Sequence, residues 1–312
     1  MLSNIQEKVL SFVVRKGTGV SAENIAKKLR LNQSTVRQSL KRMREKDIIL
    51  KEEFMLNYPL LGFKSAFVFF KINQSGLGLE SFAEKITKEK GVAHVFIITG
   101  DYDLGIKIVR KSFSAITNTV MEMEKKFSDS IENSSIVICS SVHKLDYCVL
   151  EKNEKIECDK TMKKILGFKI ENPDAAISAV SKALEIHRNT AGKKWKEALQ
   201  KKIVLKKKPV IAKKYHAQLG IKFNAVMLFD AVTGKSEELA EKISELDETK
   251  EVVHGISHHD LLAIVTTADI DGFYNFHRKI YLNPKYAGLI KETKSLVIMV
   301  QQEHNLNPFT KI

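Results

Sequence analysis

The sequence predicts an α+β fold in which two winged helix-turn-helix domains alternate with two ferredoxin-like βαββαβ domains. Three observations carry this prediction. Residues 20–50 show two helical periodicities separated by a short interruption, and residues 61–150 read as strand, helix, strand, strand, helix, strand. The same order of patterns returns about 155 residues later, which indicates an internal repeat. We therefore expect domains at residues 1–60, 61–150, 151–212 and 213–312.

The first helix-turn-helix is expected to follow a helix over residues 3–15. Ser21 can cap the next helix by accepting a hydrogen bond from a first-turn N–H, while Val20 packs on Ile25. The periodicity stops at Leu31-Asn32. A second helix is then expected from about Gln33 to Lys46.

The outward face of this second helix mixes cationic side chains with short or amide side chains. Arg and Gln suit base edges in the major groove, whereas Lys, Ser and Thr suit phosphate oxygens. An ordinary solvated helix face is the alternative interpretation. The residues predicted to contact DNA are Gln33, Ser34, Thr35, Arg37, Gln38, Lys41, Arg42 and Arg44.

A wing strand is expected over residues 48–58, ending at Pro59. Alternating and continuous apolar patterns then predict a four-stranded antiparallel sheet backed by two helices. Its strands and helices are expected at residues 62–72, 79–90, 92–99, 103–109, 112–127 and 135–142.

The turn between the two middle strands carries a family resemblance. Thr99, Gly100, Tyr102, Asp103 and Leu104, with Leu61-Gly62-Phe63 entering the first strand, resemble the Lrp/AsnC family of regulators. The resemblance implies a second domain of the RAM or ACT-like type, which oligomerises and binds small effectors, commonly amino acids. An amino-acid-like effector would then lie at the turn, although a plain β-turn is equally compatible with the sequence. The effector residues would be Gly100, Asp101, Tyr102 and Asp103.

The second half of the chain departs from the first in its recognition helix, expected over residues 188–202. Gly192 stands where the first copy has Arg37, and the exposed cations are mostly Lys, which act as point charges rather than bidentate readers. We expect this copy to add phosphate affinity more than base readout. Its predicted DNA contacts, including a basic wing, are Arg188, Asn189, Thr190, Lys193, Lys194, Lys206, Lys207 and Lys208.

Charge supports polyanion binding at these two places. The net charge of +14 divides into +6 over residues 1–60, +10 over residues 151–214 and −2 over the remainder. Three cysteines without a paired spacing indicate a reducing compartment, and no apolar run is long enough to span a membrane, so a cytoplasmic location is expected. The sequence contains no recognised catalytic, metal-binding or cofactor-binding motif. The adjacent His258 and His259 would point to opposite faces of a strand, so they could not share one metal ion.

These features predict a DNA-binding transcription regulator that is not an enzyme. Its ACT-like domains are expected to pair either within the chain or as a homodimer. Two alternatives are kept: a non-specific architectural DNA-binding protein, and a siroheme-decarboxylase-like enzyme, since such enzymes share the architecture. Against the enzyme, the H-x-Y-N-L-W-F strand of those enzymes is replaced here by residues 101–106 and 258–263.

Overall fold

The computed structural model describes residues 2–73, 78–151, 155–219 and 223–303. These residues form two compact units, each assembled from two separate stretches of the chain. The first unit contains residues 2–61 and 155–219, and the second contains residues 62–151 and 223–303. Alternate segments of the chain therefore associate in pairs: the two helical segments form the first unit, and the two sheet-forming segments form the second.

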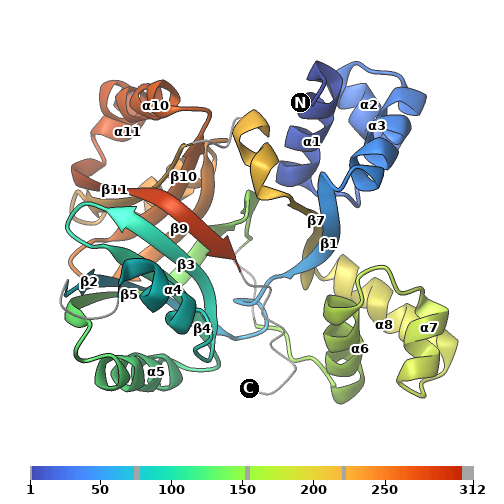
Figure 1. Cartoon of the computed structure of the whole chain (residues 1–312), viewed down its shortest axis with the longest axis horizontal. Coiled ribbons are helices and arrows are strands. Elements are labelled where there is room, and N and C mark those ends of the chain that lie inside the picture. The colour runs from blue at the N-terminus through green and yellow to red at the C-terminus, as the bar shows by residue number, and fades with distance from the viewer. Residues whose placement is uncertain (1, 74–77, 152–154, 220–222, 304–312) are drawn as a thin grey trace. The chain divides into compact units, whose positions relative to one another are not determined.

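The first unit consists of two lobes, each made of three helices followed by one strand (Figure 1). The first lobe comprises α1 (Asn4–Lys16), α2 (Ala22–Leu29), α3 (Gln33–Glu45) and β1 (Ile49–Leu56). The second lobe comprises α6 (Lys160–Glu171), α7 (Ile177–Ala183), α8 (Arg188–Gln200) and β7 (Val204–Ile211), followed by the 3₁₀ helix η1 (Lys213–Leu219). The predicted cap of α2 is confirmed, because Ser21 Oγ accepts a hydrogen bond from the Asn24 N–H at 3.2 Å.

The two lobes are joined by their strands. β1 and β7 form an antiparallel two-stranded sheet in which Glu52 lies opposite Pro209 and Phe54 lies opposite Lys207. The turn after α1 also packs on β7, where the Thr18 N–H donates to the Lys207 carbonyl at 2.6 Å. The sequence predicted a wing strand in each winged-helix domain. In the structure these two strands pair with each other, so each makes its ladder hydrogen bonds with the other lobe.

The second unit contains two half-barrels with the same order of elements. The first half-barrel comprises β2 (Lys64–Ile72), α4 (Leu79–Ile86), β3 (Val92–Thr99), β4 (Leu104–Arg110), α5 (Phe113–Lys126) and β5 (Ile131–Leu145), followed by β6 (Cys148–Val149). The second half-barrel comprises β8 (Phe223–Ala231), α9 (Ser236–Ser244), β9 (Thr249–Ile256), β10 (Leu261–Thr267), α10 (Ile270–Leu282), α11 (Pro284–Ala287) and β11 (Ile290–Glu303). This repeated order is the pattern on which the proposal of a tandem duplication rests.

The eight long strands of this unit form a closed antiparallel sheet. Their order is β2-β4-β3-β11-β8-β10-β9-β5, and β5 pairs back to β2. The two half-barrels meet where β3 pairs with β11 and where β5 pairs with β9. Both pairings lie within this one chain.

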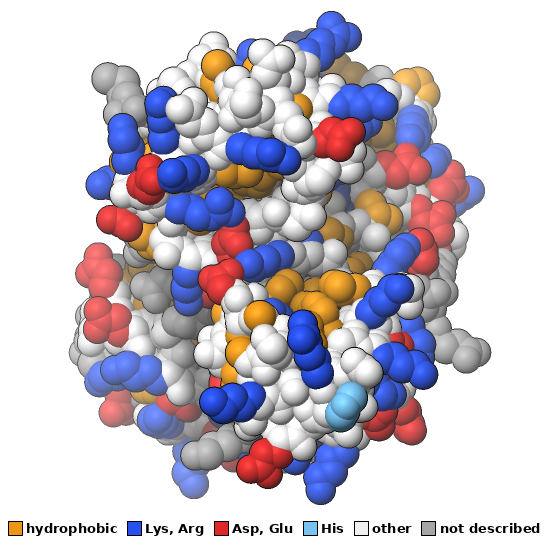
Figure 2. Space-filling view, turned by 90° about the vertical axis from the view of Figure 1, so that its right-hand side faces the viewer, with side chains coloured by type: hydrophobic (Ala, Val, Ile, Leu, Met, Phe, Trp, Pro, Cys, Tyr) orange, Lys and Arg blue, Asp and Glu red, His pale blue; other side chains and the backbone are white. Residues whose placement is uncertain are grey.

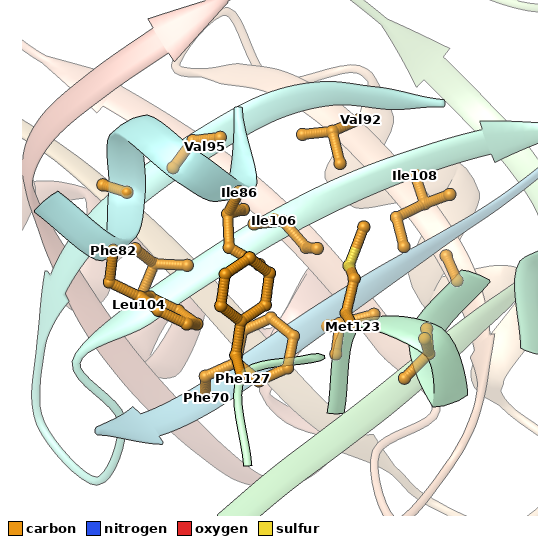
Figure 3. Packing of buried hydrophobic residues seen from close by; sticks show 14 of the residues in the cluster. Phe70, Phe82, Ile86, Val92, Val95, Leu104, Ile106, Ile108, Met123 and Phe127 are labelled. Atoms are coloured by element: carbon orange, nitrogen blue, oxygen red, sulfur yellow. The ribbon is translucent and has the colours of Figure 1, made fainter. Parts of the chain in front are cut away.

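Alternation along the strands divides the apolar side chains between three cores. One side of the first half-barrel packs under α4 and α5, where Phe82, Phe127 and Met123 meet strand residues such as Ile106 (Figure 3). An equivalent core lies under α9 and α10. The opposite faces of both half-barrels point into the closed sheet, which is filled by side chains from both of them, among them Phe67. Burial of this third, shared core stabilises the association of the two half-barrels, while the other two cores stabilise each half-barrel by itself.

Candidate nucleic-acid interface

Helix α3 presents a polar face because its apolar residues are committed to the core of the first lobe. Val36 and Met43 are buried there with Ile25 of α2, and Leu40 is half-buried against the same cluster. Of the predicted contact residues, Thr35 is half-buried, and the exposed ones are Gln33, Ser34, Arg37, Gln38, Lys41, Arg42 and Arg44. The structure therefore brings the predicted set together on one helix.

The cations of this face differ in whether a carboxylate already holds them. Arg44 makes an ion pair with Glu52 at 2.8 Å, and Lys41 lies 3.7 Å from Glu45. Within the described ranges, no Asp or Glu lies at ion-pairing distance from Arg37 or Arg42. These two guanidinium groups are thus available for a ligand.

Helix α8 is the counterpart in the second lobe. Arg188, Asn189, Thr190 and Lys193 are exposed, as predicted from the sequence. Lys194 differs, because its ammonium is held by Asp159 at 2.6 Å and by Glu197 at 3.3 Å. The bond to Asp159 raises the pKa of Lys194 above its usual value.

Figure 2 shows the surface of both lobes of the first unit. Lys and Arg side chains are exposed over both the upper, first lobe and the lower, second lobe, with some Asp and Glu among them. The α8 face owes its orientation to Trp195, which packs edge-on against Phe54 of β1 with ring centroids 4.9 Å apart. The two helical faces are therefore anchored to a shared sheet.

The lysines of the predicted basic wing lie on β7 and are buried or half-buried. Lys206 is buried, and its ammonium donates to the carbonyls of Val14 and Arg15 at 3.2 and 3.0 Å, in the last turn of α1. Lys207 is ion-paired with Glu52 at 2.6 Å and Asp174 at 2.7 Å. Lys208, the third residue of the predicted basic wing, is half-buried on the same strand.

Glu52 is the centre of a charged network that sequence reasoning missed. Its carboxylate is bonded on one side by Arg44 of α3 and on the other by Lys207 of β7. Burial by itself raises the pKa of Glu52, but hydrogen bonds from Lys207 and Arg44 outweigh it and hold the pKa below 4.5. The network links helix α3 of the first lobe to strand β7 of the second lobe. The sequence signal for this network was the excess of lysines over acidic residues near residue 207.

The turn predicted to hold an effector has its carboxylates engaged within the chain. Asp103 accepts hydrogen bonds from the Ile72 N–H at 2.9 Å and from Lys71 Nζ at 3.1 Å. Asp101 is ion-paired with Lys294, which lowers the pKa of Asp101. An ammonium ligand at this turn would have to displace one of these lysines.

The other two residues of the turn have structural surroundings. Tyr102 packs on Phe69, with ring centroids 5.7 Å apart. Gly100 has φ +129°, and a Cβ placed on it would lie 3.0 Å from a methyl group of Leu296. The positive φ and this close approach account for a glycine here.

The second half-barrel uses the same turn without the glycine. Asp260 accepts a hydrogen bond from the Ala231 N–H at 2.8 Å, the same end-of-strand bond that Asp103 makes to Ile72. The Asp-Leu pair that ends both turns was the sequence signal for this equivalence. The neighbouring His259 is bonded to Asp230 at 2.7 Å.

Searches for other kinds of site gave two further findings. Among the described residues, no three His, Cys, Asp or Glu side chains are grouped so that they could hold a metal ion. In the same part of the chain, none of the helices combines the length and the apolar character needed to cross a bilayer.

The chain was compared with known proteins. No family model matches it. The HTH-type transcriptional regulator FL11 of Pyrococcus furiosus is 28% identical over 145 residues, which cover 46% of this chain and 93% of the regulator. An uncharacterized HTH-type transcriptional regulator of Pyrococcus horikoshii is 30% identical over 126 residues, covering 39% of this chain and 84% of its own length.

Over the whole chain, the fold is similar to that of the siroheme decarboxylase NirDL solved with an iron-uroporphyrin III analogue. The TM-score is 0.62, the identity 14%, and the match covers 98% of this chain and 95% of that one. At this identity the likeness concerns the fold alone. The relatives that are alike in sequence are regulators, and this chain therefore belongs to the family of HTH-type transcriptional regulators, as its resemblance to the Lrp/AsnC family predicts.

Proposed function

We propose that this chain binds double-stranded DNA at a specific site through α3 and α8, two unlike recognition helices supplied by a single chain. The exposed face of α3 carries the proposal. Arg37 and Arg42 lack a carboxylate partner within the described residues, and Gln33 and Gln38 lie beside them. Arg and Gln side chains can make paired hydrogen bonds to guanine and adenine edges in the major groove.

The second helix adds a different chemistry to the same unit. Arg188 and Lys193 of α8 are exposed, whereas Lys194 is occupied by Asp159 and Glu197. Because α3 and α8 differ in sequence, the two halves of the DNA site need not be related by symmetry, unlike the palindromes read by symmetric dimers. We therefore propose an asymmetric operator with one half read mainly by α3.

A salt series with two DNA fragments tests this proposal. A 40-base-pair duplex from upstream of the protein's own gene is compared with a random duplex, and log K is expected to fall by about 0.9 per phosphate neutralised. Preference for the upstream fragment supports a specific regulator. Equal affinity with a steep slope would instead indicate an architectural DNA-binding protein, and absence of binding at low salt would refute both.

Footprinting on the preferred fragment then tests the division of labour. Arg37→Ala is expected to weaken protection over one half of the site, and Arg188→Ala over the other half. The exposed Lys125 of α5, replaced by Ala, is the control outside both helices, and it is expected to leave both halves of the footprint unchanged. Identical footprints for Arg37→Ala and Arg188→Ala would contradict two distinct reading helices.

One observation favours a second candidate, a siroheme-decarboxylase-like enzyme. The NirDL fold matches the chain over nearly its full length, and that protein was solved with a tetrapyrrole analogue. Titration with iron-uroporphyrin III followed by absorbance separates the candidates: a saturable shift of the tetrapyrrole spectrum supports the enzyme, and an unchanged spectrum supports the regulator.

We also propose that the second unit responds to an amino-acid-like effector. The closed sheet with its outer helices is the part of the chain that the Lrp/AsnC resemblance assigns to this role. Thermal unfolding with each of the common amino acids at millimolar concentration tests it, because a ligand that binds only the folded protein raises its stability. A uniform melting temperature across the series would remove the effector from the proposal.

A further inference from the structure

The interior of the closed sheet contains one ion pair that joins the two half-barrels. Lys107 of β4 and Glu251 of β9 are in contact through Nζ and Oε1, and their side chains are 2% and 3% exposed. The ammonium also lies 5.6 Å from the centre of the Phe67 ring. The nearby Cys139 is buried as well, and burial raises the pKa of its thiol to about 12.

The interface between the half-barrels is nearly two-fold symmetric in its choice of strands. β3 and β5 are the outer strands of the first half-barrel, and β9 and β11 are their counterparts in the second. The contacts are β3 with β11 and β5 with β9, so each half-barrel offers the same two edges. Each could therefore pair through these edges with a second copy of itself.

The residues at the centre break this symmetry. Lys107 lies opposite His94 in the β4–β3 ladder, and Ile264 lies opposite Glu251 in the β10–β9 ladder. Because the ladders correspond strand for strand, Lys107 has the place that Ile264 has in the other half-barrel, and His94 has the place of Glu251. The first half-barrel thus contributes the cation and the second contributes the carboxylate.

If two copies of the same half-barrel paired, Lys107 or Glu251 would be buried without a partner of opposite charge. Two first half-barrels would set Lys107 against the His94 position of the partner copy, with no carboxylate there. Two second half-barrels would set Glu251 against Ile264. A buried charge that loses its partner is strongly destabilising, because the desolvation of the remaining ion is no longer offset.

We infer that Lys107 and Glu251 determine which half-barrels pair, so that a first half-barrel accepts a second half-barrel and rejects another copy of itself. The ion pair acts here through the penalty on wrong pairs, which is a recognised use of buried polar groups. The partner that fits the two edge strands of each half-barrel is therefore the other half-barrel of the same chain.

Native mass spectrometry of a cleaved chain tests the inference. A protease site is placed between β6 and α6 in the full-length protein, and the folded protein is cleaved, dissociated in denaturant and allowed to reassociate. First–second pairs are expected to exceed like pairs at least a hundredfold. Pairing of β1 with β7 also joins the two fragments, whatever residues stand at 107 and 251. The test is therefore the difference in pairing preference between the wild type and the variants below.

The first variant makes the two half-barrels alike at these positions. Lys107→Ile with Glu251→His gives both halves the same residue types, and the preference for first–second pairs is expected to fall at least tenfold. The control is Lys279→Ile with Glu248→His, which removes an ion pair of 3.3 Å within the second half-barrel and is expected to leave the preference unchanged. An unchanged preference in the first variant would overturn the inference.

A second variant keeps the test decisive if the first does not refold. Lys107→Glu with Glu251→Lys retains an ion pair with reversed charges, and its cleaved, isotope-labelled fragments are mixed with those of the wild type. Mixed pairs would bring two like charges together and are expected at under a hundredth of the matched pairs. Free mixing of the fragments would show that the ion pair does not select partners.

Discussion

Replacing Lys206 by Met separates a structural role of the β7 lysines from contact with DNA. The side chain is buried, and its ammonium donates two hydrogen bonds to carbonyls in the last turn of α1, at 3.2 and 3.0 Å. Hydrogen bonds to charged groups contribute about 1.5–3 kcal/mol each, and a cation at a partly buried helix C-terminus adds up to about 2 kcal/mol. Methionine keeps the aliphatic stem, and water can reach part of the released carbonyls. We therefore expect a loss near the lower limit for two such bonds, about 3 kcal/mol in the free energy of unfolding.

Urea unfolding followed by circular dichroism measures this loss, and DNA binding across a salt series measures the other possibility. The matched control is Lys193→Met on α8, which is exposed and is expected to leave stability within about 0.5 kcal/mol while reducing the salt slope by about 0.9. The reasoning would be refuted if Lys206→Met kept full stability and lost one unit of salt slope, since Lys206 would then contact a phosphate.

Three further substitutions probe the site, the charged network and the turn. Arg37→Ala should reduce the preference for operator over random DNA by about 1–3 kcal/mol in a competition assay, and an equal loss on both DNAs would exclude base readout. Glu52→Gln should flatten the pH dependence of unfolding: the folded-state pKa of this carboxyl is lowered below 4.5, so its contribution is present above pH 4.5 and disappears as pH falls further. A difference in stability between wild type and variant that persists in acid, once this carboxyl is protonated in both the folded and the unfolded state, would contradict this assignment. Gly100→Ala should destabilise the second unit by about 1–3 kcal/mol in a thermal melt, because φ is +129° and the new methyl would meet Leu296. An unchanged melting temperature would mean that the turn relaxes freely.

Local patterns predicted the helices and strands that carry the candidate site. The inward stripe of α3 sets its outward face, so the exposed set around Arg37 followed directly from periodicity. The pairing of β1 with β7 could not be found in this way, because residues 49–56 and 204–211 are far apart in the sequence and each strand alone resembles a wing. Helix α6 was missed as well, although its buried Met162 and Leu166 follow helical spacing.

The β7 lysines show which part of their surroundings the sequence did not predict. The run of three lysines predicts a basic wing that contacts DNA, yet alternation after the buried Val204 places Lys206 on the inward side of the strand. Its burial is tolerated because helix α1 supplies carbonyls, and no sequence pattern near residue 206 announces that helix. Composition predicts how much charge a segment has, while tertiary partners decide how much of it a ligand can use.

Closure of the eight-stranded sheet also has a consequence for biosynthesis. β3 and β5 leave the ribosome with their outer hydrogen-bonding edges unsatisfied, and β11, the partner of β3, is made about 200 residues later. At synthesis rates of about 5–20 residues per second, this interval lasts on the order of 10–40 s. Unpaired strand edges can pair with the edges of other chains. An incomplete chain can therefore aggregate with chains that neighbouring ribosomes are making from the same messenger RNA.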